Sequence, residues 1–123
     1  MAFQRVCSLD DLWEGEMQVF TVAGEDVLVV NAGAGIVRAF DAVCPHQDTQ
    51  LIDGTLEGRI LTCPAHLWQF DVESGLGVNP TGCRMKQYPT SVSGEDVLVD
   101  IESPIAAVHA PAAAPSGQNG AKP

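Results

Sequence analysis

The sequence lacks any long apolar run. Hydrophobic residues make up 46% of its 123 residues, but no stretch approaches the roughly 18 uninterrupted apolar residues that a membrane helix needs. The start of the chain also lacks the basic first residues and apolar centre of a secretory signal. We therefore expect a protein of the cytoplasm that has no membrane partner and folds as one domain.

Basic residues and catalytic motifs are scarce as well. Six Lys and Arg residues stand against 16 Asp and Glu residues, which gives a formal net charge of -10. Such a charge repels phosphate backbones, so we expect no nucleic acid partner and favour a partner with a basic protein surface. The sequence contains no Gly-rich nucleotide loop, no nucleophile paired with a base and no open metal site, so no independent catalysis is expected.

Strand character appears in several short segments with β-branched residues and a two-residue rhythm. Turn-forming sequences at residues 23–26, 31–35 and 93–96 separate some of them. This pattern predicts an all-β sandwich or small barrel, with one helical turn at residues 8–13 that has Ser8 as its N-cap. The expected strands are residues 18–22, 27–30, 36–40, 59–62, 69–72 and 97–101.

Beyond residue 102 the composition shifts to Ala and Pro, which offer little to a core. We expect a domain at residues 1–102 and a disordered tail at residues 103–123. Cys7 and Cys83 fit no ligand spacing and are expected as buried thiols. Core or half-buried packing positions are expected for Trp13, Phe20, Phe40 and Tyr88.

Two short blocks combine a thiol with an imidazole, namely CPHQ at residues 44–47 and CPAHLW at residues 63–68. The sixteen residues between His46 and Cys63 allow the chain to run out and return, so that two adjacent loops present both blocks. These loops would supply sulfur from Cys44 and Cys63 and nitrogen from His46 and His66. In a reducing compartment, cysteines are more typical of metal ligands or thiols than of a disulfide framework.

Two metal groups fit this donor set: tetrahedral zinc, or a [2Fe-2S] cluster with two cysteines on one iron and two histidines on the other. Zinc fingers usually group their cysteines in one block and their histidines in another. Here each block mixes one of each, which favours the cluster. A plant-type cluster would need a Cys-x4-Cys-x2-Cys run, which the chain lacks.

The spacing Cys-x-His, sixteen residues, Cys-x-x-His resembles the signature of Rieske [2Fe-2S] proteins. The surrounding sequence is similar, more narrowly, to the Rieske ferredoxin component of bacterial toluene monooxygenases, which are multicomponent di-iron monooxygenases. The similarity spans about residues 3–101. The stretches that carry it are VCSLDDLWEGEM, VCPHQ, TCPAHLWQF and GVNPTGC.

This resemblance implies a Rieske-type antiparallel β-sandwich with a small cluster-binding subdomain, whose loops lie within about residues 43–83. It also implies one [2Fe-2S] cluster in a soluble one-electron carrier. Such carriers take electrons from an NADH-dependent flavin and iron-sulfur reductase and pass them to the di-iron hydroxylase of an aromatic monooxygenase. The alternatives are the ferredoxin of a Rieske ring-hydroxylating dioxygenase and a structural metal-binding subunit.

The same resemblance indicates a docking face and a low potential. The expected docking and electron-exit residues are Pro45, Gln47, Trp68 and Pro80, although Trp68 equally fits a packing role. Rieske proteins of respiratory complexes carry an extra cysteine in each ligand loop, where this chain has Thr49 and Ala65. They also carry a serine and a tyrosine that hydrogen-bond the sulfurs, where this chain has Trp68 and Phe70. We therefore expect a potential in the lower part of the roughly -150 to +300 mV Rieske range.

Overall fold

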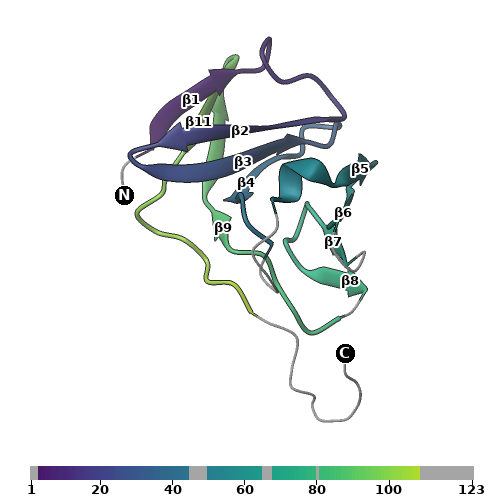
Figure 1. Cartoon of the computed structure of the whole chain (residues 1–123). Helices are drawn as coiled ribbons and strands as arrows, with labels where there is room; N and C mark the ends of the chain where they lie inside the picture. Colours follow the sequence, from purple (N-terminus) through teal and green to yellow (C-terminus); the bar gives the residue numbers. More distant parts are fainter. Residues whose placement is uncertain (1–2, 45–49, 65–67, 80, 109–123) are drawn as a thin grey trace.

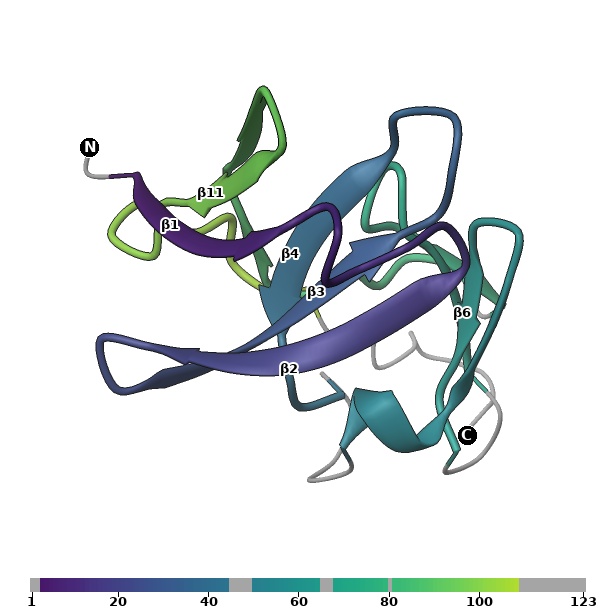
Figure 2. The ribbon, with the colours of Figure 1, turned by 90° about the horizontal axis from the view of Figure 1, so that it is seen from above.

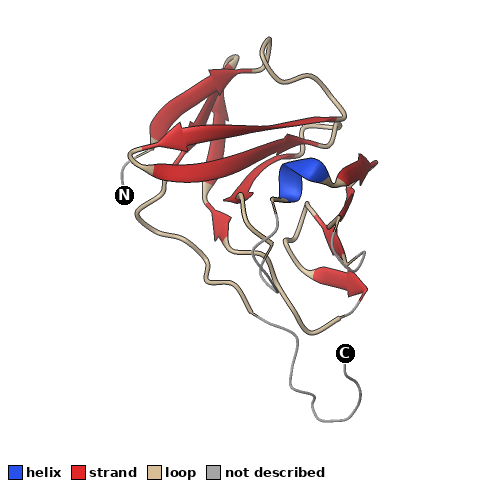
Figure 3. Ribbon diagram, viewed as in Figure 1, coloured by secondary structure: helices blue, strands red, loops and turns tan. Residues whose placement is uncertain are grey.

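The fold consists almost entirely of antiparallel strands (Figures 1 and 3). The computed structural model describes residues 3–44, 50–64, 68–79 and 81–108. Within these ranges the only helix is the short 3-10 turn η1 (Leu51–Asp53), and no helix has the length and apolar character that crossing a membrane requires. The predicted all-β class and antiparallel pairing are confirmed.

The strands form three sheets. The first sheet has the order β1 (Gln4–Ser8), β11 (Asp96–Val99), β10 (Thr90–Ser93). The second has the order β2 (Glu16–Val22), β3 (Glu25–Asn31), β4 (Val37–Asp41), β9 (Gln87–Tyr88). The third has the order β5 (Thr55–Glu57), β6 (Ile60–Thr62), β7 (Gln69–Asp71), β8 (Gly77–Asn79).

Strand β3 separates two hydrophobic cores. Its side chains alternate in direction, as strand geometry requires: Val27 and Val29 belong to one core, while Leu28 and Val30 belong to the other. All four are fully buried. The first core lies against the β1-β11-β10 sheet and the second against the β5–β8 sheet, so the second sheet stands between the other two (Figures 1 and 2).

Local turn chemistry explains the β2–β3 hairpin. Val22 pairs with Glu25, which leaves Ala23 and Gly24 as the two-residue turn. Both have positive φ, 49° and 87°, as the tight turns that match the twist of a hairpin demand. The predicted hairpin connections at residues 31–35 and 93–96 are likewise confirmed.

Ser8 ends β1, and residues 9–11 form hydrogen-bonded turns in place of the helical turn expected at residues 8–13. The Ser8 hydroxyl accepts a hydrogen bond from the Asp10 N–H at 3.1 Å, but no helix follows, so the expected N-cap is wrong. Trp13 is 69% exposed, so its expected place in or beside the core is wrong. Its indole N–H instead donates to the Asp10 carbonyl at 3.0 Å, on the surface.

The described chain does not stop pairing at residue 102. Ile105 and Gln87 exchange two backbone hydrogen bonds, at 2.9 and 2.7 Å, and Val108 and Arg84 exchange two more, at 2.7 and 3.0 Å. These bonds lay residues 105–108 along the segment that enters β9. Residues 109–123 lie outside the described ranges.

Candidate metal centre

Strand β4 delivers the first cysteine to the second core. The chain leaves β4 through the buried Ala42, and a single antiparallel bridge between Val43 and Gln50 then closes the segment 44–49. Cys44 is the first residue of that segment and is only 2% exposed. On the return side, the Leu51 N–H donates to the Ala42 carbonyl at 2.9 Å, which fixes the base of this first loop.

The hairpin of β6 and β7 delivers the second cysteine. Thr62 and Gln69 form its last strand pair, and segment 63–68 connects them. The Cys63 N–H donates to the Trp68 carbonyl at 2.7 Å, so a backbone hydrogen bond also closes this second loop. Cys63 is fully buried.

The two loops are equivalent in construction. Each has the same length, is closed by antiparallel pairing at its base and begins with Cys-Pro. Cys44 and Cys63 belong to the same buried cluster, together with Phe40, Leu61 and Phe70. All four cysteines of the chain are described and none forms a disulfide, so two thiols in a dry, shared environment suit thiolate ligation of a metal.

Several of the expected site residues lie outside the described ranges. These are the two histidines, His46 and His66, and three of the four expected docking residues, Pro45, Gln47 and Pro80. Trp68 is described: it is half-buried and packs against the core that holds both cysteines. Among the described residues alone, no three His, Cys, Asp or Glu side chains gather into a metal site.

A third loop lies beside these two. The Gly77 N–H donates to the Cys83 carbonyl at 2.8 Å and thereby closes segment 77–83. Cys83 is 3% exposed and shares the core of Cys44 and Cys63, whereas Cys7, also 3% exposed, belongs to the other core. Burial raises the pKa of both thiols, which confirms their expected character as buried thiols.

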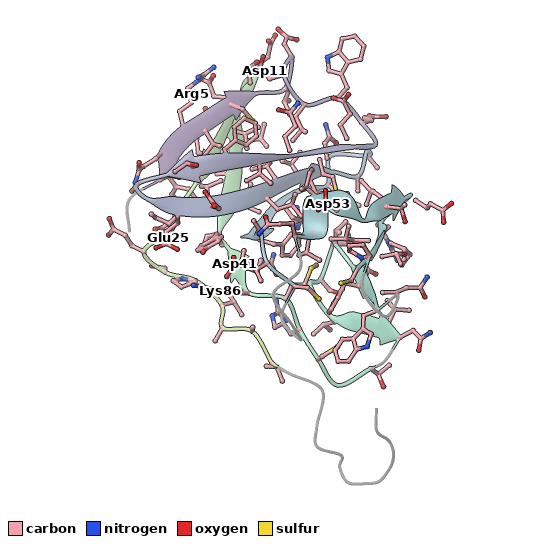
Figure 4. The ribbon with its side chains drawn as sticks, viewed as in Figure 1. Arg5, Asp11, Glu25, Asp41, Asp53 and Lys86 are labelled. Atoms are coloured by element: carbon pink, nitrogen blue, oxygen red, sulfur yellow. The ribbon has the colours of Figure 1, made fainter. Side chains whose placement is uncertain are left out.

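The described basic side chains all make contacts with other groups of the same molecule. Arg59 pairs with Glu73 at 2.8 Å and with Asp71 at 3.5 Å. Arg84 donates to the Ser74 carbonyl at 2.9 Å and to Gln87 at 2.8 Å. The other engaged cations are Arg5 at Asp96, Arg38 at the Glu73 carbonyl, and Lys86, whose amine lies 5.5 Å from the centre of the Tyr88 ring (Figure 4).

With its cations engaged, the surface is dominated by carboxylates that have no basic partner among the described side chains. Asp53 at η1 is an exposed example on the half of the molecule that carries the ligand loops (Figure 4). Glu57 at the end of β5 is exposed as well. The net charge of -10 therefore gives the surface a negative electrostatic potential. This potential attracts a basic protein surface and repels polyanions.

One residue that sequence reasoning missed is Gly54, which follows η1. A Cβ atom at this position would lie 2.0 Å from the backbone carbonyl oxygen of Thr62, the residue that precedes Cys63. The φ of Gly54 is -84°, so no left-handed turn marks it as special. Its only sequence signal is a glycine between the two ligand blocks.

Comparison with known proteins agrees with this arrangement. The family model of the Rieske [2Fe-2S] domain matches residues 2–89. The ferredoxin component of the alkene monooxygenase system of Xanthobacter autotrophicus is 46% identical over 98 residues, which cover 79% of this chain and 80% of that protein. The ferredoxin component of the biphenyl 2,3-dioxygenase of Rhodococcus jostii is 35% identical over 103 residues, covering 83% and 95%.

A solved structure shares the fold. The ferredoxin of carbazole 1,9a-dioxygenase from Nocardioides aromaticivorans IC177 superposes with a TM-score of 0.71 at 30% identity, covering 80% of this chain and 97% of that one. The two buried thiols at the starts of equivalent loops fit the cysteine half of a Rieske cluster's ligand set. The chain therefore belongs to the Rieske [2Fe-2S] domain family and binds one cluster of that type.

Proposed function

We propose that this protein is the ferredoxin component of a multicomponent monooxygenase. It takes electrons singly from an NADH-dependent flavin and iron-sulfur reductase and passes them to a di-iron hydroxylase, with no catalysis of its own. The observation that carries the proposal is the pair of equivalent loops, each opening with a buried cysteine of one shared core. The similarity to the alkene monooxygenase ferredoxin supports the choice of partner.

Four side chains would hold the cluster: Cys44, His46, Cys63 and His66. The two cysteines supply sulfur from the buried loop bases. His46 follows Cys44 by two residues and His66 follows Cys63 by three, so the covalent chain keeps the Cα atom of each histidine within about 7 or 11 Å of the Cα atom of its cysteine. This mixed order lets each loop give one ligand to each iron.

When bound, a Rieske cluster takes up and releases one electron. The surrounding core keeps water from the cysteine side, because Leu61 and Phe70 are fully buried beside both thiols. Phe70 carries no hydroxyl that could hydrogen-bond a ligand sulfur. Fewer such hydrogen bonds leave the added negative charge less stabilised, so we propose a potential in the lower part of the Rieske range.

The electron would leave at the loop end, through a docking face made of Pro45, Gln47, Trp68 and Pro80. Trp68 offers an amphipathic ring, half-buried against the cluster core, of the kind that is enriched at protein interfaces. The acidic surface supports a partner with a basic rim. We propose the cytoplasm as the compartment, because a reducing environment keeps the cysteines of such a chain available as metal ligands or thiols.

An alternative partner is a Rieske-type ring-hydroxylating dioxygenase. It is favoured by the similarity to the biphenyl dioxygenase ferredoxin and by the match to the carbazole dioxygenase ferredoxin. The fold and the loops serve either role equally, because they hold the same cluster. The partner's surface, and not the cluster, therefore decides between the two.

The decisive experiment offers the reduced, cluster-loaded protein to both kinds of oxygenase. Stopped-flow absorbance would follow its reoxidation by a di-iron hydroxylase and by a ring-hydroxylating dioxygenase under identical conditions. We expect faster transfer to the di-iron hydroxylase. Faster transfer to the dioxygenase would establish the alternative, and no transfer to either, with an intact cluster, would refute the carrier role.

A further inference from the structure

Gly54 joins the bases of the two ligand loops. Gln50 closes the base of the first loop, the turn η1 follows directly, and Gly54 closes that turn by donating its N–H to the Leu51 carbonyl at 2.9 Å. Strand β5 then begins at Thr55, which pairs with Thr62. Antiparallel register therefore sets Gly54 across from Cys63.

At this point the two chain segments approach more closely than any side chain would permit. A Cβ on Gly54 would lie 2.0 Å from the Thr62 carbonyl oxygen and 3.1 Å from its carbonyl carbon. Both atoms belong to the backbone, so no side-chain rotation relieves the contact. Because real Cβ atoms essentially never come closer than 3.0 Å to such atoms, one segment would have to move by about 1 Å.

We infer that Gly54 is a positioning residue of the cluster site: its missing Cβ sets the separation between the loop of Cys44 and the loop of Cys63. The group that the added Cβ would meet is the carbonyl of Thr62, whose peptide bond continues into Cys63. Metal-ligand distances tolerate only about 0.2 Å, so a movement of about 1 Å at the adjacent peptide exceeds what the cluster can absorb. The inference rests on the proposed ligand roles of the two cysteines.

The test is Gly54→Ala with Gly58→Ala as its matched control. Gly58 lies in the turn of the same β5–β6 hairpin and has φ +60°, but a Cβ there meets nothing within 4 Å. Ala at position 58 thus adds backbone strain without contact, whereas Ala at position 54 adds contact at an ordinary φ. Each holoprotein would be examined by iron content, by EPR of the reduced cluster and by redox titration.

We expect Gly54→Ala to lose cluster or to hold one with shifted g-values and a shifted midpoint potential, while Gly58→Ala keeps both at their wild-type values. Wild-type signals from Gly54→Ala would overturn the inference. These readouts involve no partner protein. A wild-type protein whose intact cluster reduces no oxygenase would therefore refute the proposed function. The role of Gly54 would still be decided by the iron content, the EPR spectrum and the midpoint potential of its variants.

A second variant covers a folding failure. If circular dichroism shows that Gly54→Ala is unfolded, Gly54→Ala/Thr62→Gly gives the Thr62 peptide freedom to turn its carbonyl away. A folded double variant with altered g-values and potential supports the inference, and one with wild-type values overturns it. If neither variant folds while Gly58→Ala does, the contact serves the fold and not the cluster, and the inference also fails.

Discussion

The N–H of Cys63 donates a hydrogen bond to the carbonyl of Trp68 at 2.7 Å, so the first and last residues of the second loop are tied together. This bond joins two backbone groups and does not involve the indole. A substitution of Trp68 can therefore remove the side chain while the loop remains closed.

We predict that Trp68→Ala slows electron transfer to the oxygenase several-fold but leaves the EPR spectrum unchanged. The half-buried indole also packs on the core, so we expect a loss of about 1–2 kcal/mol in the free energy of unfolding. Stopped-flow rates and thermal denaturation measure the two effects. Trp13→Ala is the control, since Trp13 is 69% exposed on another part of the surface. An unchanged rate of electron transfer in Trp68→Ala would show that Trp68 serves only in packing.

The ligand assignment predicts that His66→Ala destroys or alters the cluster. Removal of one imidazole leaves an iron without its nitrogen donor, so iron content should fall or the EPR spectrum should change. The matching control is His109→Ala, which lies in the Ala/Pro-rich segment, 43 residues after His66 in the sequence. A wild-type spectrum and potential in His66→Ala would show that His66 is not a ligand.

Phe70→Tyr is predicted to raise the midpoint potential. Phe70 is fully buried in the core of both cysteines, and a hydroxyl that reaches a ligand sulfur would stabilise the reduced state. If the hydroxyl finds no acceptor, the variant should instead lose about 1–3 kcal/mol of stability at an unchanged potential. Phe20→Tyr, beside the other core, is the control in the redox titration and should leave the potential unchanged.

Docking should depend on salt. With the described cations engaged and a net charge of -10, we expect the second-order rate of oxygenase reduction to fall about tenfold from low to high ionic strength. Removal of the exposed carboxylate that follows the first loop, in Asp53→Asn, should weaken that dependence. Glu95→Gln, in the β10–β11 turn, should not. A rate independent of salt would argue against a basic partner face.

Alkaline pH should destabilise the protein through Cys7. Burial raises the pKa of this thiol above its ordinary value of 9.0, so the folded state favours the neutral form. The stabilisation is complete below the unfolded pKa and is lost as the pH rises through the folded one. Urea titrations from pH 8 to about 10.5 should therefore show a smaller alkaline loss for Cys7→Ala than for the wild type. Parallel pH profiles would contradict this account.

The sequence predicted those parts of the fold that local chemistry determines. The turn at Ala23 and Gly24 follows from a sequence typical of tight turns, and β3 from its continuous run of four apolar, mostly β-branched residues. Strands β1, β5, β8, β9 and β10 were not expected. Of these, β5, β8 and β9 have only two or three residues each, a length at which a two-residue period is hard to recognise. The pairing of Val108 with Arg84 joins residues far apart in the chain, and no local pattern announces it.

The site divides in the same way. The spacing of Cys44 and Cys63 from their histidines predicted two loops, and the structure places both cysteines in one buried core. The role of Gly54 could not be predicted, because the need for a glycine at this position arises only from the register of β5 on β6. Trp13 was misplaced because its hydrophobicity suggested burial, whereas neighbouring turns hold it outward through the Asp10 carbonyl.

The pairing of Val108 with Arg84 also offers a defined position for a spin label. Arg84 follows Cys83, which lies in the same core as Cys44 and Cys63, and Ala106 is exposed between the two isolated bridges at Ile105 and Val108. A nitroxide attached at Ala106→Cys would therefore be held, by the backbone hydrogen bonds on either side of it, next to the segment that follows Cys83. Its relaxation should report the oxidation state of the iron and the approach of an oxygenase without any change to the loops themselves.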